Sequence, residues 1–110
     1  MKCFSYNKFF EVMGGKTRLR ILEILKTKPK CVSDICHDVK EEQSKVSHNL
    51  RVLRECNFVE QEIVGKKRVY SINKKTIVPL MKIVDKHVSS FCTGCDKREK
   101  LDKNSKIKVK

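Results

Sequence analysis

Apolar residues recur at helical spacing in the first part of the chain. Phe9, Phe10 and Met13 predict a short first helix, which Gly14 and Gly15 end because glycine inside a helix costs backbone entropy. From Thr17 to Lys28-Pro29, a second periodic segment predicts a mostly buried helix, whose apolar face carries Leu19, Ile21, Leu22, Ile24 and Leu25.

Two further helices are predicted on either side of the polar segment Lys40-Glu41-Glu42. The first is short and contains Val32, Ile35, Cys36 and Val39, with Asp34 in its first turn, where a negative charge suits the helix dipole. The second runs from about Gln43 to Glu55 and buries Val46, Leu50 and Leu53. Its opposite face is polar and basic. Asn57 follows, where a left-handed residue often ends a helix.

The period of the pattern then changes from helical to alternating. Val59, Gln61 and Ile63 precede the segment Val64-Gly65-Lys66-Lys67, and Arg68, Tyr70 and Ile72 follow it. This arrangement predicts a β-hairpin with a basic tip.

A long fifth helix is predicted near the end of the chain. Pro79 fits it only in the first turn, and its apolar stripe comprises Ile77, Leu80, Met81, Val84, Val88 and Phe91. The lysine-rich segment 96–110 is typical of a solvated tail. The predicted organisation is therefore one domain over residues 1–95 and a basic tail over residues 96–110.

The charge and composition narrow the choice of partner. The formal net charge of +13 attracts polyanions, so nucleic acid is the first partner to consider. No window has the length of a membrane-spanning helix and the amino end carries no export signal, so we expect a cytoplasmic protein that binds no membrane. We then expect the six cysteines to stay reduced.

The order of elements predicts a mainly α fold with a β-hairpin, which is a winged helix-turn-helix. A helix with a polar face fits the major groove of DNA, and the hairpin would meet phosphates with Lys66, Lys67 and Arg68. No paired carboxylates, activated nucleophile or phosphate-binding glycine loop is present, so the sequence does not indicate an enzyme.

Three segments resemble the ArsR/SmtB family of metal-responsive repressors, over about residues 9–90. They are Lys16-Thr17-Arg18-Leu19-Arg20-Ile21-Leu22, the helix segment 43–54 with its Leu-Arg-Val-Leu-Arg ending, and Gly65-Lys66-Lys67-Arg68-Val69-Tyr70. The resemblance implies a repressor released from its operator by an inducer. It also implies that base edges would be contacted by Gln43, Ser44, Ser47 and His48, and the DNA backbone by Lys45, Asn49, Arg51 and Arg54.

A homodimer is expected from the same pattern. The apolar stripe of the fifth helix is too long for one small domain to cover, and with Phe9, Phe10 and Met13 it would pack against a second copy. In the family, the first and last helices form the dimer. Two recognition helices would then lie one DNA turn apart, which predicts an inverted-repeat operator on double-stranded DNA.

Cysteine pairs are the candidate metal ligands. The spacing of Cys92 and Cys95 suits two thiolates on one soft or borderline ion such as zinc, cadmium, lead or arsenite. Asp85 and His87 resemble the start of the family's fifth-helix metal motif, but the later ligands of that motif would fall on Arg98 and Leu101. A second, weaker candidate is Cys31 with Cys36, which resembles the family's third-helix thiolate motif. Cys3 would be able to join either pair.

Two alternatives remain open at this stage. Cys92 and Cys95 would also suit a redox sensor that closes a disulfide. Such a protein would still be a DNA-binding regulator, but oxidation would replace metal as its signal. A non-enzymatic interaction or dimerisation module would keep the fold but would not use the positive charge to bind DNA.

Overall fold

A computed structural model describes residues 5–91 of the chain. The chain forms two compact units, Met1–Asn73 and Lys74–Lys110, and each is described by itself. The predicted boundary between residues 95 and 96 falls outside the described residues.

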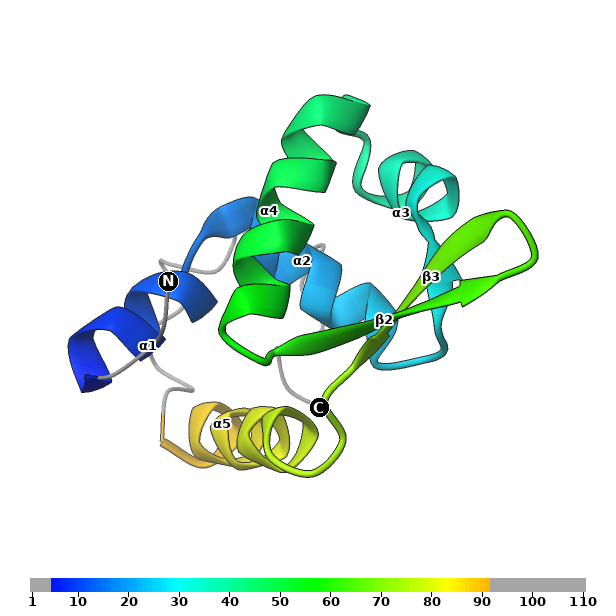
Figure 1. Cartoon of the computed structure of the whole chain (residues 1–110). Coiled ribbons are helices and arrows are strands. Elements are labelled where there is room, and N and C mark those ends of the chain that lie inside the picture. The colour runs from blue at the N-terminus through cyan, green and yellow to red at the C-terminus, as the bar shows by residue number, and fades with distance from the viewer. Residues whose placement is uncertain (1–4, 92–110) are drawn as a thin grey trace. The chain divides into compact units, whose positions relative to one another are not determined.

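The first unit holds four helices and three strands among its described residues (Figure 1). In chain order these are α1 (Tyr6–Met13), α2 (Lys16–Leu25), β1 (Lys30–Cys31), α3 (Val32–Val39), α4 (Gln43–Glu55), β2 (Val59–Val64) and β3 (Lys67–Ile72). All four helices and the hairpin agree with the periodicity of the sequence, and α4 has the predicted bounds. The predicted mainly α fold with a hairpin is confirmed.

Local capping explains where the first helices begin and end. The Ser5 hydroxyl accepts a hydrogen bond from the backbone N–H of Lys8 at 3.1 Å, which caps α1. Gly14 ends α1, and Gly15 stands just before α2. Helix α2 ends at Leu25, three residues before the predicted Lys28.

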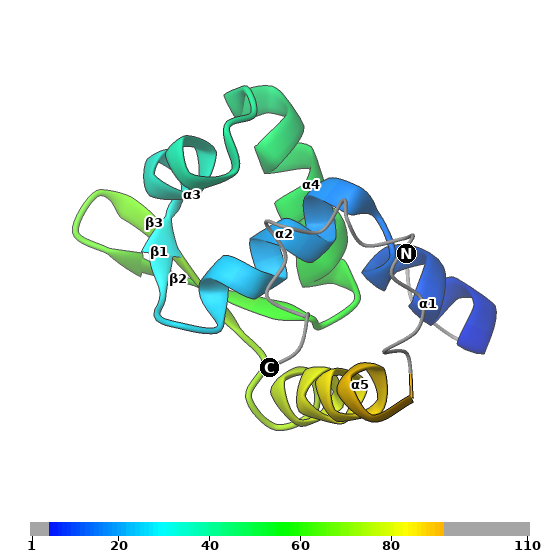
Figure 2. The same cartoon turned by 180° about the vertical axis from the view of Figure 1, so that it is seen from behind.

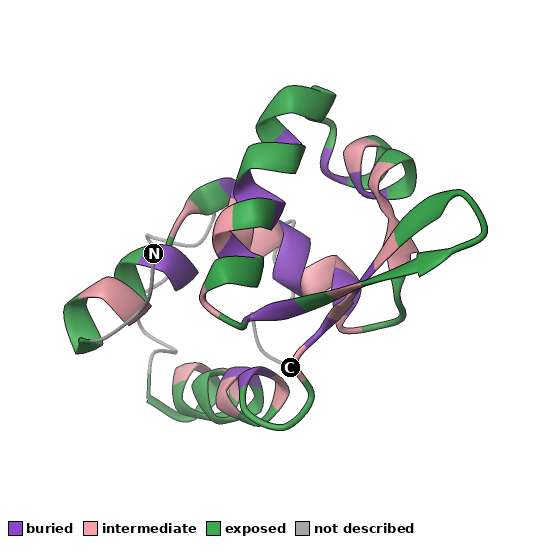
Figure 3. Cartoon of the chain, viewed as in Figure 1, coloured by how far each residue is buried: buried purple, intermediate pink, exposed green. Residues whose placement is uncertain are grey.

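The core of the first unit lies between α2, α3, α4 and the sheet. Its fully buried side chains include Leu22 from α2, Ile35 from α3, Leu50 from α4 and Phe58 from the segment before β2. Figure 3 shows the buried positions on the inner sides of α2 and α4, with exposed positions on the outer side of α4. Seen from behind, α2 lies beside α4 (Figure 2).

The three strands form an antiparallel sheet with the order β1-β3-β2. Val64 pairs with Lys67, so the hairpin turn contains only Gly65 and Lys66. Gly65 has a φ of 66°, the left-handed conformation that two-residue hairpin turns need. Strand β1 was not predicted, because two residues are too few to show an alternating pattern.

The described part of the second unit is the helix α5 (Ile77–Phe91). Pro79 is its third residue, so the proline lies in the first turn as predicted, where its missing N–H costs no helical hydrogen bond. Within residues 5–91, no helix is long and apolar enough to cross a membrane.

Candidate nucleic-acid interface

A short turn joins α3 to α4 and sets their relative direction. Lys40 ends α3 with a φ of 56°, and its N–H donates to the carbonyl oxygen of Cys36 at 2.8 Å. The Arg20 guanidinium of α2 donates to the carbonyl oxygen of Val39 at 3.0 Å. The last turn of α3 is therefore held from both sides, and α4 starts three residues after Lys40, at Gln43.

The two faces of α4 differ as the sequence pattern predicts. Val46, Leu50 and Leu53 are fully buried. The other face is exposed and carries hydroxyl, amide, imidazole and guanidinium groups, from Gln43, Ser44, Ser47, His48, Arg51 and Arg54. This face is thus free to meet a ligand.

The β2–β3 hairpin extends past α3 and is exposed at its tip (Figures 1 and 3). Lys66, Lys67 and Arg68 are all exposed there. Because the turn is short and the strands pair in register up to Val64 and Lys67, these cations are presented by an ordered element.

The exposed face of α4 and the hairpin line one open groove of about 800 Å³. The described lining residues include five cations and no carboxylate, so the groove favours an anionic ligand. The lining comprises Cys31, Val32, Ser33, Gln43, Ser44, Ser47, His48, Arg51, Arg54, Gln61, Lys66, Lys67, Arg68 and Tyr70.

Two of the predicted DNA contacts are not part of this groove. Asn49 is only 7% exposed, its side-chain oxygen accepts from Arg18, and its amide nitrogen donates to the Lys45 carbonyl. The expectation that Asn49 contacts the DNA backbone is therefore wrong, because helical geometry turns it toward α2. Lys45 is exposed, but its ammonium pairs with the Glu41 carboxylate at 3.3 Å.

Sequence reasoning missed several groove residues. Gln61 and Tyr70 lie opposite each other on β2 and β3, and the Tyr70 hydroxyl donates to the Gln61 side-chain oxygen at 2.8 Å. Alternation did place both on one face of the hairpin, but it did not show that this face turns toward α4. Cys31 and Ser33 reach the groove because β1 pairs with β3.

The described cysteines have three different environments. Hydrogen bonds to the Ser33 side chain and the Asp34 backbone lower the pKa of the Cys31 thiol. Burial raises the pKa of the Cys36 thiol, which is half-buried. Cys31 and Cys36 are free, and Cys56, just after α4, is half-buried.

Of the predicted ligands around Cys92 and Cys95, only Asp85 and His87 lie among the described residues. They are two positions apart on α5, and their role as metal ligands stays a prediction. The His87 ring lies 5.0 Å from the Phe91 ring. Among residues 5–91, no group of three or more potential ligands is close enough to hold a metal. Cys3, Cys92 and Cys95 lie outside the described residues.

The arrangement of α2, α3, α4 and the hairpin defines the class of this protein, a winged helix-turn-helix. The crystal structure of Rv0081 from Mycobacterium tuberculosis has the same fold, with a TM-score of 0.74 and 29% identity over 83% of this chain and 90% of that one. By sequence, Rv0081 is 32% identical over 80 residues, 72% of this chain and 70% of the relative, and is named an HTH-type transcriptional regulator.

Residues 15–61 match the model of the bacterial regulatory proteins of the arsR family. A transcriptional repressor SmtB homolog from Synechocystis sp. is 32% identical over 81 residues, 74% of this chain. The arsenical resistance operon repressor of Bacillus subtilis is 27% identical over 78 residues, 70% of this chain and 74% of that repressor. The chain therefore belongs to the ArsR/SmtB family, as its motifs predict.

The family contains regulators of transcription rather than enzymes, in agreement with the sequence prediction. The chain spans 61% of the length of the SmtB homolog.

Proposed function

We propose that this protein is a homodimeric repressor that acts in the cytoplasm and binds an inverted-repeat operator. The observation that carries the proposal is the groove between α4 and the hairpin, where five cations and no described carboxylate surround an exposed row of polar side chains. Both parts of this surface belong to the first unit, so their arrangement does not depend on α5.

In the proposed complex, α4 enters the major groove. Gln43, Ser47 and His48 carry donors and acceptors that can distinguish base edges. Ser44 shares this face, and Arg51 with Arg54 continues it toward the end of the helix, where guanidinium groups suit phosphates. The hairpin tip would neutralise phosphates with Lys66, Lys67 and Arg68.

The dimer is supported by α1. Tyr6 is 85% exposed and Phe10 is 55% exposed, and exposure of these aromatic rings to water is unfavourable. We propose that this surface packs against a second copy, together with the apolar stripe of α5. Closed twofold symmetry would then repeat the groove once per copy.

DNA binding is tested with a duplex that the protein itself selects from a randomised pool. We expect the purified dimer to enrich an inverted repeat, and Arg51→Ala to weaken binding of that duplex about tenfold, as loss of one good contact does. Lys28→Ala is the matched control, because Lys28 is exposed but does not line the groove. Failure to enrich any duplex at low ionic strength would favour the interaction-module alternative.

We further propose that a soft or borderline metal ion, such as zinc, cadmium, lead or arsenite, releases the operator through Cys92 and Cys95. The proposal is supported by the spacing of these two thiols and by the similarity to a repressor of arsenical resistance. Asp85 and His87 on α5 are the further ligands that we propose beside the two thiolates. The metal would have to bind the DNA-free form more tightly than the DNA-bound form.

Elemental analysis of the reduced dimer tests this signal. We expect a soft metal to copurify or to titrate in, and Cys92→Ser with Cys95→Ser to remove it. Cys36→Ser is the comparison: it should leave the metal bound, whereas loss of metal in this variant would assign the ion to the Cys31–Cys36 pair. A wild-type protein that binds no soft metal under reducing conditions would refute metal release and leave DNA binding intact.

Oxidation is the second candidate signal, because the spacing of Cys92 and Cys95 also suits a pair that closes a disulfide. Peroxide treatment would then weaken DNA binding in the absence of any metal, and a reducing agent would restore it. Cys92→Ser with Cys95→Ser should abolish that response. A doubly substituted protein that still responds to peroxide would overturn this candidate.

A further inference from the structure

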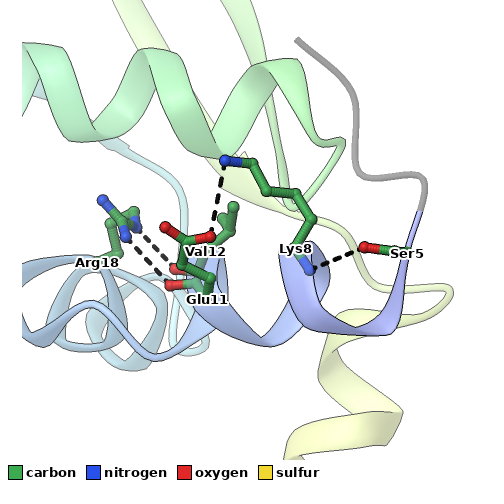
Figure 4. Close-up of polar contacts among 5 residues, drawn as sticks. All are labelled: Ser5, Lys8, Glu11, Val12 and Arg18. Atoms are coloured by element: carbon green, nitrogen blue, oxygen red, sulfur yellow. Dashed lines mark hydrogen bonds and ion pairs between the residues drawn. The ribbon is translucent and has the colours of Figure 1, made fainter.

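Arg18 of α2 lies under the carboxyl end of α1 and makes two hydrogen bonds to it. Its Nε donates to the carbonyl oxygen of Val12 at 2.7 Å, and its Nη2 donates to the carbonyl oxygen of Glu11 at 3.2 Å (Figure 4). Carbonyls in the last turn of a helix lack partners within that helix, and a cation there suits the negative end of the dipole. Arg18 therefore caps α1 from outside.

The same guanidinium also holds α4. Its Nη1 donates to the side-chain oxygen of Asn49 at 2.9 Å. The Asn49 amide nitrogen donates in turn to the Lys45 carbonyl oxygen at 2.9 Å, so both ends of this buried amide are engaged within the protein. Asn49 directly follows His48, which lines the groove. One side chain thus joins the end of α1 to the middle of α4.

The backbone at Gly15 leaves room for this arrangement. A Cβ atom at Gly15 would lie 2.6 Å from both Cζ and Nη2 of Arg18, closer than such atoms approach each other. The φ of Gly15 is −64°, so glycine is not needed there for its conformation. The space above Gly15 is needed for the guanidinium instead.

We propose that Arg18 is a positioning residue that couples the orientation of α1 to that of α4. The inference rests on the proposed function, in which α1 packs in the dimer and α4 enters DNA. In each protomer of the dimer, Arg18 would hold α4 to α1 of the same protomer, and this contact would set the distance between the two α4 helices. The dimer would therefore bind tightly only to operators whose two half-sites have one particular spacing.

The coupling follows from the geometry of the side chain. Arginine presents its donors in a rigid planar fork, so three bonds in different directions fix α1 and α4 in one arrangement. Lysine keeps the charge but has no fork, and it would not hold all three acceptors in that geometry. Arg18→Lys therefore separates positioning from charge.

The test uses the duplex selected by the wild-type dimer, versions of it whose half-sites are moved apart by one to three base pairs, and a duplex with a single half-site. We expect Arg18→Lys to weaken binding of the selected duplex about tenfold, within the usual range for coupling between sites. Its binding should become less sensitive to spacing, while binding of the single half-site changes less than about twofold. Asn49→Leu should have the same effect, and adding it to Arg18→Lys should weaken binding little further.

Two controls separate positioning from folding. Asn49→Asp keeps an oxygen acceptor for Arg18, so this variant should retain the wild-type spacing preference that Asn49→Leu loses. Arg20→Lys makes the same exchange on the same helix, but Arg20 bonds to α3 rather than to α1, so it should leave that preference unchanged. Gly15→Ala should reproduce Arg18→Lys because it displaces the guanidinium.

Equal losses on the single half-site and the full duplex, or an unchanged spacing preference in Arg18→Lys, would overturn the inference and leave the proposed function standing. A wild-type protein that selects no duplex would overturn both.

Discussion

At the scale of single residues, neighbours on α4 have opposite roles. His48 is exposed and lines the groove, whereas Leu50, two positions later, is fully buried. A helix turns by about 100° per residue, so positions two apart face opposite ways. Substitutions at these two positions should therefore separate the two properties, with His48 affecting DNA binding and Leu50 affecting stability.

We expect Leu50→Ala to lower the free energy of unfolding by about 2–5 kcal/mol, because it leaves a cavity in the core. His48→Ala should change it by less than about 0.5 kcal/mol, as exposed substitutions do, while weakening DNA binding. Urea unfolding measures the first quantity, and titration of the selected duplex measures the second. A strongly destabilised His48→Ala would show that the imidazole supports the fold.

A second residue-scale prediction concerns Asp38. Its carboxylate accepts from the Lys30 ammonium at 2.8 Å, and this hydrogen bond lowers the pKa of Asp38 below the ordinary 3.8. A lowered folded-state pKa stabilises the protein above the unfolded-state pKa, and this contribution is lost as the pH falls through the folded-state value.

Asp38→Asn should therefore be less stable than wild type at pH 7, by at most about 1 kcal/mol for so exposed a pair. The difference should disappear as the pH falls below 3.8 and through the lowered pKa. Urea unfolding at a series of pH values measures it, with Glu62→Gln on β2 as the control at an exposed carboxylate. A difference that stayed constant down to the lowest pH would show that charge is not its cause.

At the scale of elements, most of the fold follows from local patterns. The polar segment before Gln43 and the period of Val46, Leu50 and Leu53 predicted α4 at both ends. The hairpin was predicted equally well, because alternation and a glycine turn are local features. Strand β1 was missed because it exists only through its pairing with Tyr70 and Val69 on β3.

The turn between α3 and α4 provides a prediction at this scale. Lys40 adopts the left-handed conformation with a φ of 56°, which costs an L-residue about 1–2 kcal/mol. Lys40→Gly should remove this cost. Because glycine also has a larger conformational entropy in the unfolded chain, which offsets part of the gain, we expect the free energy of unfolding to rise by up to about 1 kcal/mol.

The matched control is Lys26→Gly at the end of α2. Lys26 has a φ of −63°, so glycine relieves no strain there and should lower stability by about 0.5–1 kcal/mol. Urea midpoints compare the two variants. A Lys40→Gly protein no more stable than wild type would indicate that other contacts of Lys40 compensate its backbone strain.

At the scale of the whole molecule, the charge of +13 predicts strong salt dependence. Each neutralised phosphate adds about 0.9 to the slope of log affinity against log salt concentration. If Lys67 at the hairpin tip contacts a phosphate, Lys67→Ala should lower the slope by about 0.9. Lys28→Ala, outside the groove, should leave it unchanged, and an equal fall in both variants would assign the slope to net charge alone.

The dimer is also a property of the whole molecule. Phe10→Asp should shift the protein from a dimer toward the 12.9 kDa monomer and weaken operator binding, because it places a charge in the proposed interface. Ile63→Asp makes a comparable exchange at a side chain 65% exposed on the hairpin, and should leave the dimer intact. Sedimentation velocity distinguishes the two forms, and a dimeric Phe10→Asp would place the interface elsewhere.

The sequence by itself determined the helices, the hairpin, the buried face of α4 and the family, because periodicity, turn chemistry and motifs are all local. Only the tertiary structure decided which polar side chains share a surface. It joined Gln61 and Tyr70 of the hairpin to α4, and it turned Asn49 inward to Arg18. The physical reason is that a helical pattern distinguishes apolar from polar positions, whereas the packing of α2 against α4 decides which polar position is desolvated and must find its hydrogen bonds inside the protein.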